Sequence, residues 1–311
     1  MNKKIIIDCD PGQDDAMAII LAASGVSDLK IEAITTVAGN VGVGKNTVNA
    51  LRVCDLTGLH DIPVAMGADR PLVQEPSEAS HVHGQSGLDG TDLPEEPVKQ
   101  PIDQHAVDVL IEKLLASDGD ITLVPIGPLT NIALAIRKEP RIVAKIKEIA
   151  MMGGGTFGNR TPSAEFNIYA DAEAARIVFE SGAPITMFGL DVTHQALATP
   201  DKLAELKAIE NPVAKAVADM LTFYSGAYKG NFAGAAMHDP CPIGYLIAPD
   251  IFEWDKVRVD VETTGKFTYG MTVVDFKGST GRESNVQFAR RLDSGEFWQL
   301  FLDALRSYSK S

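Results

Sequence analysis

Short apolar runs alternate with amphipathic segments along the first two-thirds of the chain, and this alternation limits the folds that it can adopt. The runs that predict strands are residues 4–9, 29–37, 62–66, 121–126, 146–152 and 185–189. The segments that predict helices are residues 14–23, 45–56, 103–116, 129–137 and 171–181. Strands that alternate with helices are typical of βαβ units. We therefore expect an α/β fold with an open, mostly parallel, Rossmann-like sheet flanked by helices.

The last third of the chain predicts additional helices and strands. Residues 203–228 have a helical pattern with a break near Asn211-Pro212, and residues 297–308 predict a closing helix. Two further strands are expected at residues 257–262 and 271–276. Because neither a repeat nor a low-complexity linker divides the 311 residues, we expect a single domain over residues 1–311.

Polar residues follow the ends of five predicted strands. They are Asp8 and Asp10, Gly39-Asn40, Gly127, Met152-Gly153, and Asp191. The carboxyl ends of parallel strands share one edge of a sheet, and ligands bind at that edge. The pattern therefore predicts that the five segments meet in one active site.

The densest of these segments is DCDPGQDDA, residues 8–16, which contains four aspartates. A single Asp here would be read as a helix cap, and Asp14 or Asp15 could have that role. Clustered carboxylates repel one another unless a cation or protons neutralise them. Pro11-Gly12 predicts a tight turn that folds Asp10 and Asp15 back onto one ion. We favour a site for a hard cation such as Ca²⁺ or Mg²⁺ over simple capping.

A second glycine-rich segment, GNVGVGK at residues 39–45, has the spacing of a phosphate-binding P-loop. That motif continues with Ser or Thr, and position 46 is Asn. We therefore interpret the match as a coincidence.

Three other segments carry polar side chains suited to a ligand. The loop HVHGQSGLDG at residues 81–90 is long enough to act as a lid and contains His81 and His83. In an extended segment, Glu165 and Asn167 would face the same way and bind one polyhydroxylated ligand. His238 lies beside Asp239, which pairs a proton donor with another oxygen ligand.

Charge and composition exclude several classes of function. The chain has 42 acidic and 28 basic residues and a net charge of −14, which repels nucleic acid. No apolar run approaches the ~18 residues of a membrane span, and the apolar start at residues 5–7 is too short for a signal peptide. The three cysteines show no CxxC spacing. We expect a cytoplasmic protein with reduced thiols and no nucleic-acid or membrane partner.

Together these segments resemble the nucleoside hydrolase family, the inosine-uridine-preferring nucleoside N-ribohydrolases. The resemblance rests on DCDPGQDDA, AGN at 38–40, HGQSGLDG at 83–90, GPLTN at 127–131, MMGG at 151–154, AEFNIYAD at 164–171 and MHDPC at 237–241. It spans nearly the whole chain and is closest to the bacterial ribonucleoside hydrolases, including pyrimidine-preferring ones.

The resemblance implies roles for particular residues of this chain. One Ca²⁺ would be held by Asp10, Asp15, Asp239 and the backbone carbonyl of Ile126. The substrate would be bound by Asp14, Asn40, His83, Met152, Glu165, Phe166, Asn167 and His238. Asp10 would take a proton from a Ca²⁺-bound water, and His238 would protonate the departing base, with His83 or His81 as alternates. Asp8 would support the cluster from behind.

The expected reaction is Ca²⁺-dependent hydrolysis of the N-glycosidic bond of ribonucleosides to ribose and free nucleobase. Positive charge develops on the ribose as this bond breaks, and nearby carboxylates stabilise it. Tyr224, Tyr228 and Phe232 either stack on the base or pack in the core. The resemblance also implies nucleoside salvage or catabolism and a homodimer or homotetramer.

Two other functions remain open from the residues alone. Asp8-Cys9-Asp10 superficially fits a metal-dependent phosphohydrolase of the haloacid-dehalogenase type, although Gly12 stands where that family has Thr or Val. A nonenzymatic ribonucleoside-binding protein would explain the ribose contacts but not the carboxylate cluster.

Overall fold

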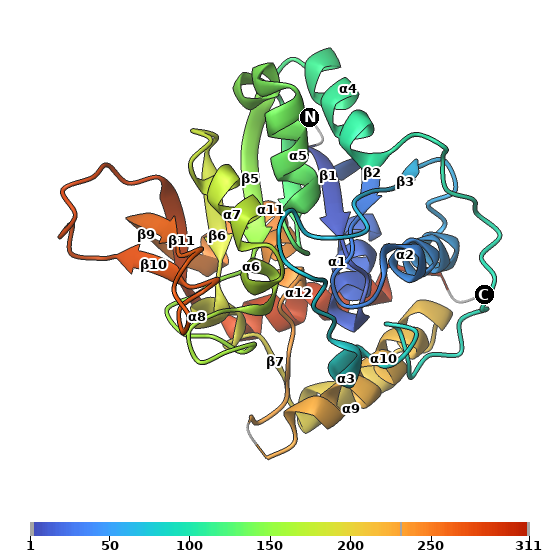
Figure 1. Ribbon diagram of the computed structural model, residues 1–311. Coiled ribbons are helices and arrows are strands. Elements are labelled where there is room, and N and C mark those ends of the chain that lie inside the picture. Colours follow the sequence, from blue (N-terminus) through green and yellow to red (C-terminus); the bar gives the residue numbers. More distant parts are fainter. Residues whose placement is uncertain (1–2, 231, 310–311) are drawn as a thin grey trace.

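The computed structural model describes residues 3–230 and 232–309, which form a nine-stranded sheet between two layers of helices (Figure 1). The strands lie in the order β10-β9-β11-β6-β5-β4-β1-β2-β3. Their bounds are β1 (Lys3–Cys9), β2 (Leu29–Thr36), β3 (Val64–Met66), β4 (Ile121–Pro125), β5 (Ile146–Met152), β6 (Ile185–Phe188), β9 (Phe252–Val261), β10 (Thr272–Asp275) and β11 (Val286–Leu292).

Seven of the nine strands, from β3 across to β11, pair in parallel, and β9 and β10 add an antiparallel edge. The order 3-2-1-4-5-6 of the first six strands is that of a doubly wound sheet, in which the direction of winding reverses between β1 and β4. The predicted Rossmann-like α/β architecture is confirmed. A crevice is expected at the carboxyl ends of β1 and β4.

Both faces of the sheet are covered because its central strands are apolar on both sides. In β1, Ile5 and Ile7 pack into one core and Ile6 packs into the other. The first core involves α1 (Gln13–Ala23), α2 (Val43–Thr57), α10 (Pro212–Tyr228), α11 (Pro240–Ile247) and α12 (Ser294–Arg306). The second core involves α4 (Ala106–Ala116), α5 (Thr130–Lys138) and α7 (Ala172–Phe179).

Shorter elements complete the described chain. They are α3 (Ser80–His83), α6 (Phe166–Ala170), α8 (Leu190–Thr193), α9 (Pro200–Lys207), the 3₁₀ turns Pro140–Lys145 and Pro249–Ile251, and the paired strands β7 (Leu197–Ala198) and β8 (Ala235–Ala236). The predicted break between α9 and α10 is confirmed. Asn211 caps α10 through its side chain, which accepts from Ala214 N, and Pro212 occupies the first turn.

Strand β11 was not expected from the sequence. Its residues Gln287, Arg290 and Arg291 are polar, and an irregularity between Ala289 and Arg291 interrupts the alternation that identifies a strand. The strand nevertheless has a structural role, because it joins the parallel sheet to the antiparallel edge.

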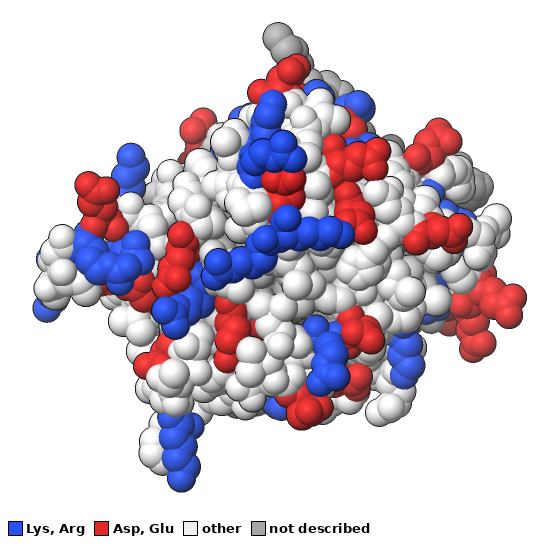
Figure 2. All heavy atoms as spheres, turned by 45° about the horizontal axis from the view of Figure 1, so that its top comes forward, with Lys and Arg blue, Asp and Glu red and all other residues white. Residues whose placement is uncertain are grey.

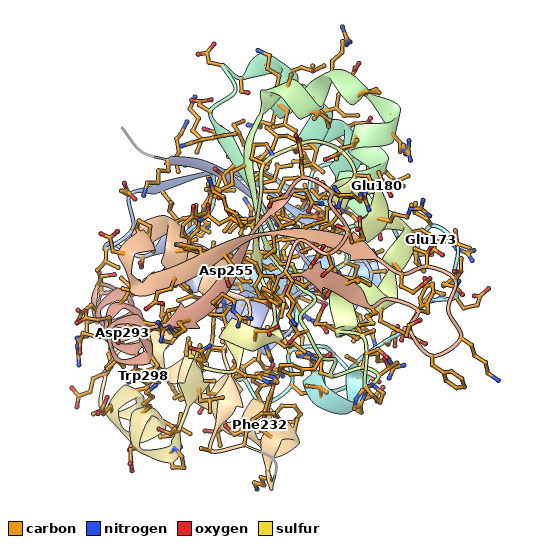
Figure 3. The ribbon with its side chains drawn as sticks, turned by 90° about the vertical axis from the view of Figure 1, so that its left-hand side faces the viewer. Glu173, Glu180, Phe232, Asp255, Asp293 and Trp298 are labelled. Atoms are coloured by element: carbon orange, nitrogen blue, oxygen red, sulfur yellow. The ribbon has the colours of Figure 1, made fainter. Side chains whose placement is uncertain are left out.

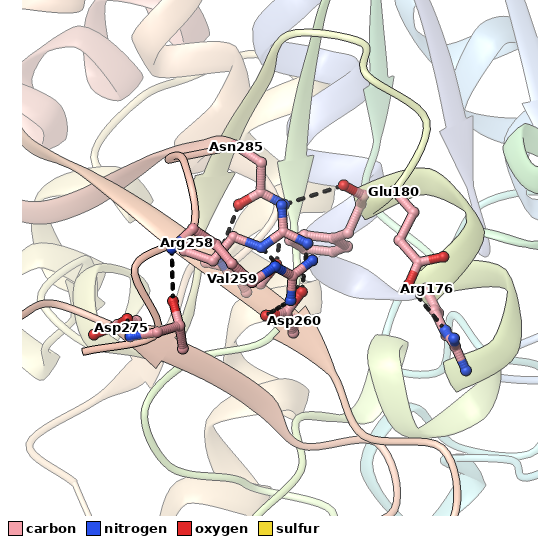
Figure 4. A network of polar contacts seen from close by, with 10 residues as sticks. Arg176, Glu180, Arg258, Val259, Asp260, Asp275 and Asn285 are labelled. Carbon is pink, nitrogen blue, oxygen red and sulfur yellow. Dashed lines mark hydrogen bonds and ion pairs between the residues drawn. The ribbon is translucent and has the colours of Figure 1, made fainter. Parts of the chain in front are cut away.

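Side-chain hydrogen bonds fasten this antiparallel edge to the rest of the fold (Figure 4). Asn285 accepts from Val259 N and donates to the carbonyl oxygens of Val259 and of Phe179 at the end of α7. Arg258 pairs with Asp260 on the same strand. The edge is thus structural, and its polar residues lie far along the sheet from the β1–β4 junction.

The outer surface carries charges of both signs. Lys and Arg side chains lie among Asp and Glu side chains over the face shown in Figure 2 rather than in one basic patch. Among the described helices, none combines the length and the apolar character needed to cross a bilayer.

Candidate active site

A pocket of about 200 Å³ opens at the carboxyl ends of β1 and β4, where the winding of the sheet reverses. Its walls come from segments far apart in the sequence. They include Asp10 after β1, Asn40 after β2, Ile126 after β4, Met152 at the end of β5, and Asp239 before α11. The predicted convergence holds for these segments. It fails for Asp191, which is not part of the pocket lining and instead accepts hydrogen bonds from Thr156.

The turn between β1 and α1 gathers the aspartates. Asp15 is in the first turn of α1 and points back over the turn, so that its Oδ1 accepts from Asp10 N at 3.1 Å and its Oδ2 from Gly12 N at 3.0 Å. Carboxylate oxygens of Asp14, Asp15 and Asp239 all lie within 4.8 Å of one another. Asp14, to which the resemblance assigns ribose binding, therefore lies in one group with Asp15 and Asp239, to which it assigns the metal.

These carboxylates are buried and have strongly perturbed pKa values. Burial raises the pKa of Asp14 to about 8 and of Asp15 to about 6. Burial, reinforced by the negative charges of neighbouring aspartates, holds the pKa of Asp10 and of Asp239 well above the usual range. No Lys or Arg of the described chain forms an ion pair with them. A bound cation would relieve both the desolvation and the repulsion.

The donor atoms fit a hard divalent cation. Asp10 Oδ2 accepts from Asn40 N at 2.7 Å, whereas Asp10 Oδ1 is buried without a partner among the described residues. Two glycines leave room for this carboxylate, since a Cβ at Gly39 or Gly127 would lie 2.1 or 2.4 Å from an Asp10 oxygen. The cluster consists of carboxylates without Cys or His, which favours Ca²⁺ or Mg²⁺ over a softer metal.

Asp8 lies behind this cluster. Its Oδ1 accepts from Thr35 Oγ1 at 2.6 Å and from Asn131 Nδ2 at 2.8 Å, and burial raises the pKa of Asp8 to about 7. Asn131 also binds the carbonyl of Thr36 and the amide of Ala68. This asparagine, which the sequence pattern did not single out, thus connects α5 to the ends of β1, β2 and β3.

Glu165 and Asn167 form another part of the wall. The expectation that they lie in an extended segment is wrong, because Glu165 caps α6 and Asn167 is in its first turn. Glu165 accepts from the backbone N–H groups of Gly154, Asn167 and Ile168, which explains why a helix starts there. Asn167 Nδ2 donates to the carbonyl of Ile126 at 2.9 Å. Both side chains still line the pocket.

A chain of hydrogen bonds between side chains forms a further part of the pocket wall. Tyr224 OH donates to Asp14 Oδ2 at 3.3 Å and lies 3.0 Å from Tyr228 OH. Tyr228 OH lies 2.8 Å from His238 Nε2, and Thr193 Oγ1 lies 2.7 Å from His238 Nδ1. Burial lowers the pKa of His238 to about 3, so the resting ring is neutral. The chain connects the carboxylate cluster with a histidine inside one pocket.

The other predicted pocket residues fall into two groups. His81, His83 and Phe166 line the pocket, as do Tyr224 and Tyr228. Phe232 does not: its side chain is 43% exposed and packs against His194 and Tyr228 at the periphery of the molecule (Figure 3). Asn159 and Arg160 were not predicted but also line the pocket, and the only signal for them was their place after the glycine run at 153–155.

Known proteins resemble this chain along its whole length. The sequence profile described as "Inosine-uridine preferring nucleoside hydrolase" matches residues 5–299. The inosine-uridine preferring nucleoside hydrolase of Crithidia fasciculata is 47% identical over 98% of each chain. The pyrimidine-specific ribonucleoside hydrolase RihA of Shewanella woodyi is 47% identical over 100% of each chain.

Solved structures agree with the sequence comparisons. The plant nucleoside hydrolase PpNRh1 superposes with a TM-score of 0.93 at 34% identity, over 99% of this chain and 100% of that one. A purine-preferring ribonucleoside hydrolase from Gardnerella vaginalis superposes with a TM-score of 0.90 at 32% identity, over 98% of each chain.

Proposed function

The chain belongs to the inosine-uridine preferring nucleoside hydrolase family and hydrolyses ribonucleosides to ribose and free base, and we propose that it does so with Ca²⁺ and with Asp10 as the catalytic base. The observation that carries this proposal is the group of buried aspartates at the β1–β4 crevice, in the same pocket as His238. The sequence pattern left two other functions open, a phosphohydrolase and a nonenzymatic binding protein. Because the chain belongs to the nucleoside hydrolase family, both are rejected.

The metal ligands that we propose are Asp10, Asp15, Asp239 and the carbonyl oxygen of Ile126. The all-oxygen donor set, the partnerless Asp10 Oδ1 and the proximity of Asp15 to Asp239 support this assignment. When bound, the cation would lower the pKa of the attacking water and orient the ribose hydroxyls.

Asp10 is suited to the role of base by its geometry. The Asn40 amide holds its Oδ2 and so fixes the carboxylate, and a carboxylate that would itself contact the ion lies within reach of a water bound to that ion. Proton transfer to a positioned base contributes roughly 10²–10⁴-fold to a rate.

The ribose is proposed to lie between Asp14, Asn40, Glu165, Asn167 and Met152, all of which line the pocket. Backbone N–H groups hold the Glu165 carboxylate in place before any substrate binds. Negative groups fixed in this way stabilise the positive charge that develops on the ribose, since they need no reorganisation during the reaction.

His238 is the proposed acid for the leaving base. Each of its ring nitrogens contacts a hydroxyl, and a hydroxyl can either donate or accept. A proton that the ring gives to the base must be replaced, and the hydroxyls of Tyr228 and Tyr224 connect Nε2 to the Asp14 carboxyl, which can supply it. This exchange allows a histidine that is neutral at rest to act as an acid.

Several finer features extend the proposal. The relatives include enzymes named for inosine and uridine, for pyrimidines and for purines, and we propose that both uridine and inosine are substrates. We further propose a cytoplasmic homodimer or homotetramer that acts in nucleoside salvage or catabolism, with residues 1–311 as one domain.

The test is ribose release from uridine and inosine before and after treatment with EDTA. Activity should disappear with EDTA and return with Ca²⁺, while thymidine should be a poor substrate because it lacks the 2′-hydroxyl. If EDTA leaves the rate unchanged, or if no common nucleoside releases ribose, the proposed chemistry is wrong.

A further inference from the structure

Gln13 lies within the aspartate motif but has no part in the chemistry proposed above. It begins α1, is completely buried, and directs its amide at the loop that contains His83. Its Nε2 lies 3.2 Å from the carbonyl oxygen of His83 and 3.0 Å from that of Asp89. Its Oε1 lies 2.7 Å from His83 Nδ1. One side chain thus makes three contacts with one loop.

These contacts fix the orientation of the amide. Both hydrogens of Nε2 are used by carbonyl oxygens, which accept but cannot donate. The reversed amide would place its oxygen against those two oxygens and is therefore disfavoured. Oε1 must face the imidazole, and because Oε1 only accepts, His83 Nδ1 must carry the hydrogen.

The neutral ring then has its lone pair on Nε2. Within residues 3–230 and 232–309, Nε2 of His83 has no hydrogen-bond partner, and this atom is not completely shielded from solvent. The ring lines the pocket and stacks on Tyr224 with a centroid distance of 5.5 Å. Nε2 is consequently the atom of His83 that is available to a ligand.

The loop around His83 is held firmly enough to keep the ring in this position. Asp89 accepts from the amides of Gln85 and Ser86. Lys45 and Asn49 of α2 donate to the carbonyl oxygens of Gln85 and Ser86. Lys45 is the lysine of the P-loop-like match, so its ammonium group is engaged by this loop.

The two buried histidines of the pocket therefore differ. His238 contacts hydroxyls at both nitrogens and can exchange protons, whereas His83 is restricted to one tautomer by an amide oxygen. We propose that Gln13 is a positioning residue that holds His83 as a neutral hydrogen-bond acceptor for an O–H or N–H donor of the nucleoside. This inference rests on the proposed function, and it assigns substrate recognition rather than acid catalysis to His83.

Burial agrees with this assignment, since it lowers the pKa of His83 to about 3 and keeps the ring neutral. Two groups of a nucleoside supply the required donor chemistry. One is the 5′-hydroxyl of the ribose, and the other is an N–H of the base. Comparing uridine with 5′-deoxyuridine and with 3-methyluridine separates them, because each analogue lacks one donor.

The first measurement is the tautomer of His83, read from ¹⁵N–¹H correlation spectra of histidine-labelled protein. The wild type should show the Nδ1–H form. Gln13→Met removes the acceptor at nearly constant volume and should populate the Nε2–H form, whereas Gln13→Glu retains an acceptor and should keep Nδ1–H. Gln85→Met is the matched control, because this glutamine is exposed on the same loop and its side chain has no partner in the described chain.

The second measurement is the KM for uridine. Gln13→Met should raise it by about 2- to 12-fold, the value of one hydrogen bond, with a smaller change in kcat. It should add nothing in a His83→Ala background, nor for the analogue that lacks the relevant donor. Gln13→Glu places its second oxygen against the carbonyl oxygens of His83 and Asp89, so it should not restore KM and is the control for the tautomer alone.

The spectra report the tautomer of His83 whether or not the protein hydrolyses a nucleoside. A failure of the proposed hydrolysis is therefore distinguishable from a failure of this inference. An Nε2–H tautomer in the wild type overturns the inference. Additive effects of Gln13→Met and His83→Ala also overturn it, as does an unchanged KM in a Gln13→Met protein whose tautomer has shifted.

Discussion

Replacing Tyr228 with Phe tests the hydrogen-bond chain that ends at His238. The substitution removes one hydroxyl and keeps the ring that lines the pocket. That hydroxyl lies 2.8 Å from His238 Nε2 and 3.0 Å from Tyr224 OH, so the variant loses both contacts and separates His238 from Asp14. Among the described residues, no other group forms a hydrogen bond with His238 Nε2.

The size of the effect follows from these contacts. General acid catalysis contributes roughly 10²–10⁴-fold, and the variant retains His238 itself, so we expect the lower end, about a 10²-fold loss of kcat on uridine. A hundredfold loss corresponds to about 2.7 kcal/mol in the activation barrier. The two lost hydrogen bonds should lower the free energy of unfolding by about 2 kcal/mol.

The assay compares uridine with p-nitrophenyl riboside, whose leaving group departs without a proton. Tyr228→Phe should slow the first substrate and spare the second. Tyr308→Phe is the matched control: its hydroxyl donates to the carbonyl of Ile20 at 2.7 Å, outside the pocket, and its loss should lower stability by about 1 kcal/mol without changing kcat. Equal losses on both substrates for Tyr228→Phe would refute the role of this chain in leaving-group protonation.

Two further variants test the carboxylates and the frame around them. Asp10→Ala should lower kcat at least 10²-fold. Its melting temperature in EDTA should equal or exceed that of the wild type, because the substitution removes a carboxyl whose ionised form is disfavoured by burial and by the charge of Asp15. A variant that keeps its kcat, or one that melts well below the wild type in EDTA, would contradict this account. Asn211→Ala should lower the free energy of unfolding by about 1 kcal/mol through loss of the α10 cap, with KM and kcat unchanged, as measured by denaturant titration beside steady-state kinetics.

The sequence predicted the central sheet well because parallel strands buried on both faces are continuous apolar runs. Strand β11 was missed since its arginines and its irregular register hide that signal. Polar residues after strands identified most of the pocket. The pattern failed at Asp191, which lies in the first turn of the short helix α8 and is not part of the pocket lining. The end of a strand determines where the following residue lies but not the direction in which the chain continues. A polar residue after a strand can therefore point away from the pocket.

Other site residues were beyond prediction for a different reason. Thr193 contacts His238 across 45 positions of the sequence, and Asn131 contacts Asp8 across 123 positions. Such contacts follow from packing and leave no periodic pattern. Gln13 is similar, because its importance depends on a loop 70 positions away.

The backbone contacts of Asp15 affect how this motif should be interpreted in other sequences. Its two oxygens bind the amides of Asp10 and Gly12 and so shape the first βα corner, independently of any ion. A descendant that lost Asp239, and catalysis with it, would still be under selection to keep Asp15 for folding. Inactive descendants should therefore retain Asp15 after the enzymatic activity has been lost. Asp239, which has no capping hydrogen bond to retain it, is the better marker of a working enzyme.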